Sequence, residues 1–276
     1  MPSTYAHYRM GQEVRSCLGE TEKKIVETYP ELFSIGLHGP DILFYYHPIL
    51  KNEVKRIGHE MHERSGKEFF EAAAKVVHSE KEKDAYLAYL YGFICHFALD
   101  VTCHGYIGEK EAASGLSHSE IETEFDRMLM VEDGLDPIRK KLTDHIVPSM
   151  ENAEIIQAFF DGVDSAHMKK ALDGMITCHN ILLAPSKGKR FVIHTLMRLA
   201  GCYENLHGLM VNYESNPQCK DSSEKLGTLY TDAKELAIRL IHEYQDYLDG
   251  KGKLNPVYDY NFGSQLMEKR EKTDEV

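Results

Sequence analysis

The most regular feature of the hydrophobic pattern is a long apolar stretch from Glu82 to His104, which predicts a buried helix. Apolar side chains fill almost every position from Tyr91 to Val101, so no polar face is left for solvent. The exceptions are His96, Asp100 and His104, which recur at every fourth residue. Residues four apart share one face of an α-helix, so these three side chains form a single polar row inside an apolar rod.

Apolar residues at helical spacing predict further helices on both sides of this rod, and no segment alternates as a strand would. One predicted helix runs from Gly11 to Tyr29, before Pro30; another runs from about Glu53 to Val77, with Gly66 as a candidate break. Loops are expected at residues 30–48 and 105–116, and an acidic, Pro-punctuated connection with room for one short helix at residues 131–148. The remaining predicted helices open at Ser117 and cover residues 153–163, 165–183, 187–202 and 221–248.

This pattern predicts an all-α protein, a multi-helix domain in which the other helices cover the central rod. With 276 residues the chain is long enough to bury a large core. We expect residues 1–130 to form a metal-binding helical core. Residues 131–276 are expected to form a C-terminal helical part that packs on this core within the same domain.

The composition is that of a soluble globular protein, with 42% hydrophobic and 28% charged residues. The sequence starts without an apolar run behind a basic segment, and no apolar run reaches the roughly 18 residues of a membrane span. We therefore expect no signal peptide and no transmembrane segment. The 6 cysteines form no CxxC pair and several lie in apolar helical runs, which is typical of reduced thiols and predicts a cytoplasmic protein.

The net charge of −12 argues against nucleic-acid binding through a basic surface. It does not exclude a small anionic substrate, because bound divalent cations would reverse the local charge. Histidine is unusually frequent: 15 are present, and 9 of them fall within the first 118 residues. Neutral imidazole is the commonest metal ligand in proteins, so this enrichment points to a metal site in that part of the chain.

The central polar row has the character of a metal site, because a buried carboxylate between two imidazoles is costly unless it is paired or bound to a metal. Two further motifs could add ligands. The turn Gly39-Pro40-Asp41 projects Asp41 from a stiff backbone, although it could equally hold a turn or capping aspartate. His118 and Glu122 share one helix face, although a capping box at Ser117 would also suit an exposed helix start.

All candidate ligands are nitrogen or hard oxygen donors, and no cysteine belongs to the set. That mixture suits catalytic zinc, which keeps one position open for water, better than thiolate-bound structural zinc or calcium. The candidates are His7, Asp41, one or more of His47, His59 and His62, then His96, Asp100, His104, His118 and Glu122. The later histidines at 167, 179, 194, 207 and 242 are expected to be core or surface residues.

These motifs resemble those of the zinc-dependent phospholipase C family and of its helical relatives, the single-strand zinc nucleases. His96-Phe-Ala-Leu-Asp100 is similar to the central His-x-x-x-Asp of the family, and His118-x-x-x-Glu122 to its later His-x-x-x-Glu. Gly-Pro-Asp41 resembles the early aspartate, His7 the histidine near the N-terminus, and His104 the histidine that follows the central aspartate. The resemblance covers roughly residues 1–130.

The resemblance implies two or three zinc ions. It assigns one zinc to Asp41, His62, His96 and Asp100, and a second to His104, His118 and Glu122. A third metal would be bound by His7 and bridged by Asp100. His62 is favoured over His59 because Met61-His62 precedes the helix of Lys67, Phe69 and Phe70 much as in relatives.

The resemblance also implies phosphoester hydrolysis by metal-activated water, with Asp41 as the candidate base. The substrate would be a phosphoester small molecule or a phospholipid headgroup. The chain departs from secreted members in having no tryptophan for the third metal and no C-terminal β-sandwich. Two alternatives remain: a non-catalytic, metal-stabilised helical protein that binds a partner or senses zinc, and a single-strand nuclease, which the acidic charge disfavours.

Overall fold

The computed structural model describes residues 4–267, without the side chains of residues 204 and 205, and within these residues it contains helices but no strand. The all-α prediction is therefore confirmed. The α-helices are α1 (Thr4–Cys17), α2 (Glu20–Thr28), α3 (Pro30–Gly36), α4 (Glu53–Glu63), α5 (Gly66–Ser79), α6 (Lys83–Ser114), α7 (His118–Glu132), α8 (Met150–Gln157), α9 (Ser165–Leu182), α10 (Lys187–Leu199), α11 (Tyr203–Leu206) and α12 (Lys220–Leu248). Short 3-10 helices are η1 (Gly39–Tyr45), η2 (His207–Leu209), η3 (Pro217–Cys219) and η4 (Pro256–Asp259).

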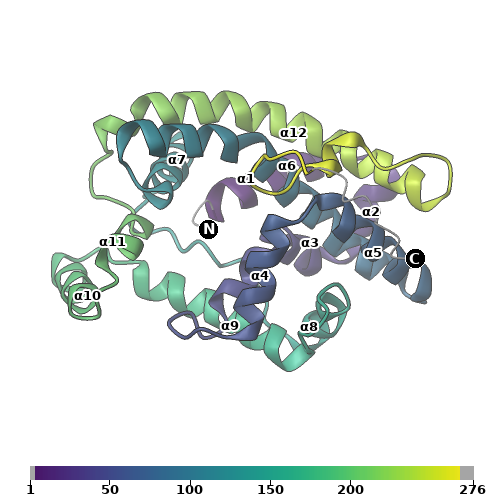
Figure 1. Cartoon of the computed structure of the whole chain (residues 1–276), viewed down its shortest axis with the longest axis horizontal. Helices are drawn as coiled ribbons and strands as arrows, with labels where there is room; N and C mark the ends of the chain where they lie inside the picture. Colours follow the sequence, from purple (N-terminus) through teal and green to yellow (C-terminus); the bar gives the residue numbers. More distant parts are fainter. Residues whose placement is uncertain (1–3, 268–276) are drawn as a thin grey trace, which may run out of the picture.

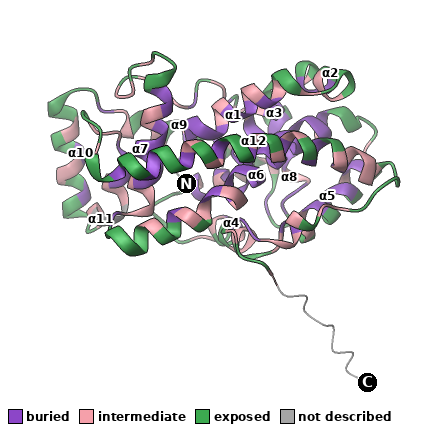
Figure 2. Cartoon of the chain, turned by 90° about the horizontal axis from the view of Figure 1, so that it is seen from above, coloured by how far each residue is buried: buried purple, intermediate pink, exposed green. Residues whose placement is uncertain are grey.

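Helix α6 is the centre of the fold, as the apolar rod predicted. The most extensive helix packing is that of α3 and α12 on α6, and α12 runs along one edge of the molecule beside α6 and α7 (Figure 1). Buried segments gather around α6, whereas exposed residues lie on the outer helix faces (Figure 2). Every residue from Leu87 to Asp100 is buried. His96 and Asp100 of the central polar row are therefore enclosed by protein, whereas His104 is partly exposed.

Helix α6 continues through the segment that the sequence predicted to be a loop. It ends only at Ser114, and Gly115 follows with a left-handed φ of 71°. Gly105 and Gly108 lower helix propensity without ending the helix, because Ile107 between them is buried against the core. The loop prediction for residues 105–116 was wrong because tertiary packing outweighed local propensity.

The N-terminal part differs from the sequence prediction in a second way. The single helix expected from Gly11 to Tyr29 is two helices, α1 and α2, separated at Gly19, whose backbone is extended. Much of the loop expected at residues 30–48 is helical, in α3 and η1. The candidate break at Gly66 is confirmed, since α4 ends at Glu63 and α5 begins at Gly66.

One hydrophobic core extends over nearly the whole described chain. It includes Tyr5 of α1 at one end and Phe262 at the other, with Leu240 and Tyr244 of α12 between them. Residues on both sides of position 130 therefore share the same core. A second, smaller cluster lies apart and consists of Ala184, Ile193, Met197 and Met210.

Among residues 4–267, one helix is long and apolar enough to span a membrane by length and composition, and it is α6. No such span was expected from the sequence, because His96 and Asp100 interrupt the apolar run. In this structure 83% of its most apolar window is buried by other helices. Helix α6 is thus the core helix of the fold.

Two glycines allow α3 to approach α6 closely. A Cβ added at Gly92 of α6 would lie 2.2 Å from the carbonyl oxygen of Phe33, and one added at Gly36 of α3 would lie 2.2 Å from that of Tyr89. The two backbones are therefore in direct contact where α3 leads into η1. This contact fixes the start of the segment that carries Asp41 against the helix that carries His96.

We expect Gly92→Ala to lower the free energy of unfolding by about 3 kcal/mol, because overpacking at a backbone contact forces the two helices apart. Gly108→Ala is the matched control in the same helix, since a Cβ there would meet nothing within 4 Å. It should be neutral or stabilise by up to about 1 kcal/mol through better helix propensity. Urea denaturation compares the two, and equal stabilities would contradict the proposed packing constraint.

Candidate metal centre

The eight ligands that the resemblance assigns to metals come together in three adjoining groups. In each group, the possible ligand atoms lie within 4.8 Å of one another. Asp100 and His96 connect the groups, because His96 belongs to two of them and Asp100 also lies near the third. The groups are His7, His96 and Asp100; Asp41, His62 and His96; and His104, His118 and Glu122.

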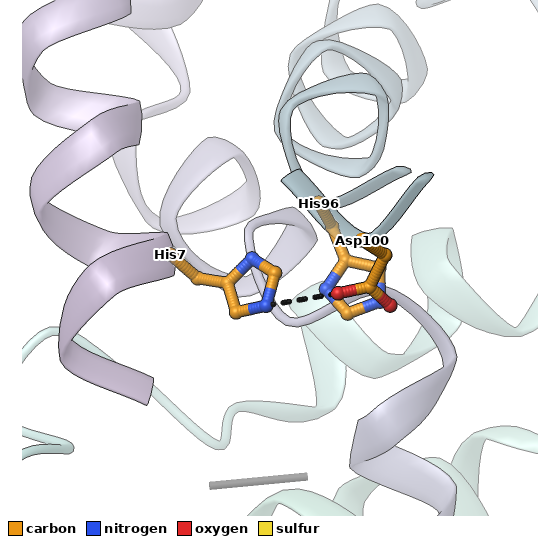
Figure 3. Close-up of side chains that lie close together, drawn as sticks. All are labelled: His7, His96 and Asp100. Atoms are coloured by element: carbon orange, nitrogen blue, oxygen red, sulfur yellow. Dashed lines mark ion pairs between the residues drawn. The ribbon is translucent and has the colours of Figure 1, made fainter. Parts of the chain in front are cut away.

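Asp100 lies at the centre of the first group (Figure 3). Its Oδ1 is 3.3 Å from Nε2 of His7, and its Oδ2 is 3.2 Å from Nε2 of His96. Oδ1 is also 3.7 Å from Nε2 of His104, which belongs to the third group. The carboxylate of Asp100 therefore contacts imidazoles on both sides, as its place in the helical row predicted.

The second group shows which intervening histidine accompanies Asp41. Nε2 of His62 lies 3.0 Å from Oδ1 of Asp41, and Nδ1 of His62 donates to the carbonyl of Gly58 at 2.7 Å. His59 packs against the ring of Phe44, and His47 against that of Tyr46. Of the three open alternatives, the structure brings only His62 into the group.

The third group lies between α6 and α7. Oε1 of Glu122 is 3.3 Å from Nε2 of His104 and 3.2 Å from Nε2 of His118. Nδ1 of His104 donates to the carbonyl of Phe262 at 2.7 Å, which leaves Nε2 directed at Glu122. Ser117 caps α7 by accepting from the backbone N–H of Glu120, as predicted, so the cap and the ligand pair coexist.

The turn before Asp41 requires glycine for two reasons. Gly39 has a positive φ of 47°, which L side chains rarely adopt. A Cβ at this position would also lie 2.2 Å from Cδ2 of His96. Gly39 therefore lets the η1 backbone approach the imidazole of His96, which brings Asp41 and His96 into the same group.

His7 is held in place by a contact that the sequence did not reveal. The carboxylate of Asp126 in α7 accepts from the backbone N–H groups of Tyr5 and Ala6, at 2.9 and 2.8 Å. These N–H groups belong to the first turn of α1, where helix donors lack partners within the helix. Asp126 thus caps α1 across 120 residues of sequence and fixes the helix that carries His7.

Electrostatics favour ionised carboxylates at the centre. Burial by itself would raise the pKa of Asp100, but His104 and His96 hold it well below its usual range. Burial would lower the pKa of His104, yet Asp100 and Glu122 raise it to about 9. The carboxylate oxygens are thus deprotonated near neutral pH, and binding of a cation must displace the proton from His104.

The residues fit a zinc ion on chemical grounds. All donors are imidazole nitrogens or carboxylate oxygens, the set found in catalytic zinc sites. Nε2 of the fully buried His96 has Asp100 as its neighbour at 3.2 Å, in a geometry that does not meet hydrogen-bond criteria, which is unusual for a buried polar atom. A cation between Nε2 and the carboxylate would satisfy both groups. The centre is therefore suited to zinc.

Three buried or largely buried histidines beside η1 were not identified as site residues from the sequence. Nε2 of His38 lies 2.7 Å from Nε2 of His145, and Nε2 of His179 lies 3.0 Å from the hydroxyl of Tyr45. Burial lowers the pKa of His145 and of His179 to about 4, so both are neutral. Only the position of His38 directly before Gly-Pro-Asp41 could have indicated this cluster, because His145 is 107 residues away.

The His38–His145 pair predicts acid sensitivity. His145 has a pKa near 6.5 in the unfolded chain and about 4 in the folded protein, because burial disfavours its charged form. Its contribution to stability is therefore complete above pH 6.5 and is lost as the pH falls to about 4. The loss from His145 amounts to about 3 kcal/mol. We expect His145→Gln, which can still hydrogen-bond but does not titrate, to flatten the decline in unfolding free energy between pH 7 and 4. Exposed His242→Gln should leave that decline unchanged; if both variants behave alike, the prediction is wrong.

Comparison with known proteins agrees with this geometry. The family described as zinc-dependent phospholipase C matches residues 6–174. The match covers more than half of the chain and extends beyond residue 130, where the resemblance was expected to end, into α9. No individual curated protein and no solved structure matches the sequence. The chain belongs to the zinc-dependent phospholipase C family.

Proposed function

We propose that this protein is a zinc-dependent hydrolase that cleaves a phosphodiester in the manner of a phospholipase C. The observation that carries the proposal is the convergence of three nitrogen–oxygen donor groups through His96 and Asp100. Family membership supports the same class of reaction. The net charge of −12 makes a small phosphoester or a phospholipid headgroup a better substrate than nucleic acid.

The proposed ligands are assigned to two or three zinc ions. Asp41, His62, His96 and Asp100 would bind the first zinc, His104, His118 and Glu122 the second, and His7 with Asp100 a third. When bound, zinc acidifies water to a pKa of about 7 and polarises phosphoryl oxygens. The side chains that hold the zinc ions would also fix where the substrate lies relative to them.

Exposure within the centre favours a catalytic over a closed structural site. The side chains of His96 and His7 are 0% and 6% exposed, whereas those of Asp41, His62 and His118 are 13%, 22% and 35% exposed. The centre is thus sealed at α1 and α6 and reaches solvent at its outer ligands. A substrate would approach on that outer side. There Asp41 would orient the attacking water and accept its proton.

The test is elemental analysis of the purified protein together with hydrolysis of bis-p-nitrophenyl phosphate and of phosphatidylcholine. We expect two or three zinc ions per chain and release of p-nitrophenol from the diester. Stoichiometric zinc with no hydrolysis of any phosphoester would instead support the non-catalytic, metal-stabilised alternative. Location in the cytoplasm stays a prediction. It was based on the cysteines, and all six are unpaired thiols in the structure.

A further inference from the structure

Helix α10 exposes an apolar face that the other described residues do not cover. Phe191, Val192, Leu196 and Leu199 are 70%, 54%, 59% and 81% exposed. At the helical spacing of about 100° per residue they share one side of α10. The opposite side packs into the small cluster through the residues Ile193 and Met197. The helix is therefore apolar on two opposite faces, and only one of them is buried.

The surroundings of this exposed face are basic in an otherwise acidic protein. No Asp or Glu occurs from Gly174 to Tyr203, although the chain carries a net charge of −12. Lys187 and Arg198 lie along one edge of the exposed apolar face, and Lys189 lies along the other. A helix with an apolar face bordered by Lys and Arg is typical of segments that lie in the interface of an anionic membrane.

No carboxylate within the described residues forms an ion pair with these basic side chains. Lys189 donates to the carbonyls of Asn180 and Leu183, and Arg198 lies over the ring of Tyr203. Among the described side chains, these basic groups therefore have neutral partners only. Each positive charge close to an anionic leaflet adds to the attraction between the protein and the membrane, and salt weakens this attraction.

We propose that α10 docks on an anionic lipid surface, with the face Phe191–Val192–Leu196–Leu199 inserted among the lipids. The helix is 13 residues long and lies at one end of the long axis of the molecule, where a flat surface can reach it (Figures 1 and 2). Two other occupants of this face are conceivable: a protein with an acidic apolar groove, and a second copy of this chain. The basic border favours the lipid surface over the second copy, whose own α10 carries the same charge. The inference rests on α10 alone and not on the proposed hydrolysis.

The first experiment is co-sedimentation of the full chain with vesicles of phosphatidylcholine, with and without phosphatidylglycerol. We expect binding to the anionic vesicles that weakens as salt is added, and little binding to vesicles of phosphatidylcholine alone. Equal binding to both, or none to either, would overturn the proposal.

The second experiment uses the triple variant Phe191→Ser, Leu196→Ser and Leu199→Ser. We expect its partitioning onto anionic vesicles to fall on the order of 100-fold, because three inserted side chains are lost. Val131→Ser, at an exposed apolar position beside Glu132 and Asp133, is the control and should bind as the unmodified protein does. Unchanged thermal unfolding shows that the variants fold, since the substituted side chains are exposed.

Two further readouts separate this proposal from others. Hydrolysis of a soluble diester should be the same in the triple variant and the unmodified protein, and its absence in both would contradict the proposed function but not the docking. Sedimentation velocity would reveal a dimer of the unmodified protein. A dimer that the triple variant fails to form, with no vesicle binding, would assign the α10 face to self-association and overturn the proposal.

Discussion

Asp100→Asn is expected to abolish zinc retention and to lower phosphodiester hydrolysis on the order of 1,000-fold or more. Asp100 contacts His7, His96 and His104, so its charge serves more than one group of ligands. The substitution keeps the shape of the side chain but replaces one acceptor oxygen with an amide NH2, which cannot bind a cation. Two quantities are measured. One is the number of zinc ions per chain, by elemental analysis after dialysis, and the other is the rate of hydrolysis of a soluble diester.

Asp84→Asn is the matched control for this variant. It makes the same change of charge in the first turn of α6, at an exposed position. Zinc content and rate should both stay within about twofold, since an exposed charge at a helix end contributes less than about 1 kcal/mol. Full zinc content and activity in Asp100→Asn would show that the carboxylate does not connect the proposed metal sites.

Removal of metal by a strong chelator is expected to lower the melting temperature on the order of 10 °C. Ligands that bind only the folded state stabilise it, by about 4 kcal/mol for each site loaded at a thousand times its dissociation constant. Zinc should restore the melting temperature, whereas magnesium should not, because imidazole is a poor ligand for magnesium. Differential scanning calorimetry with and without chelator measures the effect.

The restoration of the melting temperature by zinc should also depend on pH. The carboxylates of Asp100 and Glu122 raise the pKa of His104 to about 9, so below that pH the metal-free protein holds a proton that zinc must displace. Apparent zinc affinity should therefore rise as the pH increases toward 9. A melting temperature that is the same with and without chelator, in a protein shown to have lost its zinc, would contradict the stabilising role.

Sequence periodicity was sufficient to predict the central helix and the alignment of the candidate ligands within it. His96, Asp100 and His104 are four residues apart, and so are His118 and Glu122, so helix geometry alone aligns them. The sequence could not choose among His47, His59 and His62, because that choice depends on how α4 packs against η1. The length of α6 was also underestimated, because burial of Ile107 outweighed the two glycines beside it.

Contacts between distant segments could not be predicted from spacing. The cap that Asp126 places on α1 joins residues 120 positions apart, and Asp126 looks like an ordinary acidic residue of an amphipathic helix. His145 was expected within a loop and pairs with His38 only because the chain folds back over η1. Both features depend on tertiary structure, and neither leaves a periodic signal in the sequence.

The hydrogen bond from His104 to the carbonyl of Phe262 has a consequence for biosynthesis. His104 emerges from the ribosome 158 residues before the carbonyl that orients its ring. Helices α6 and α7 can form earlier and bring His104 beside Asp100 and Glu122, but the acceptor for Nδ1 is in place only once the segment around Phe262 has been translated and has docked. If this group binds zinc as proposed, we expect its loading to come late in the maturation of the protein, after that segment has docked.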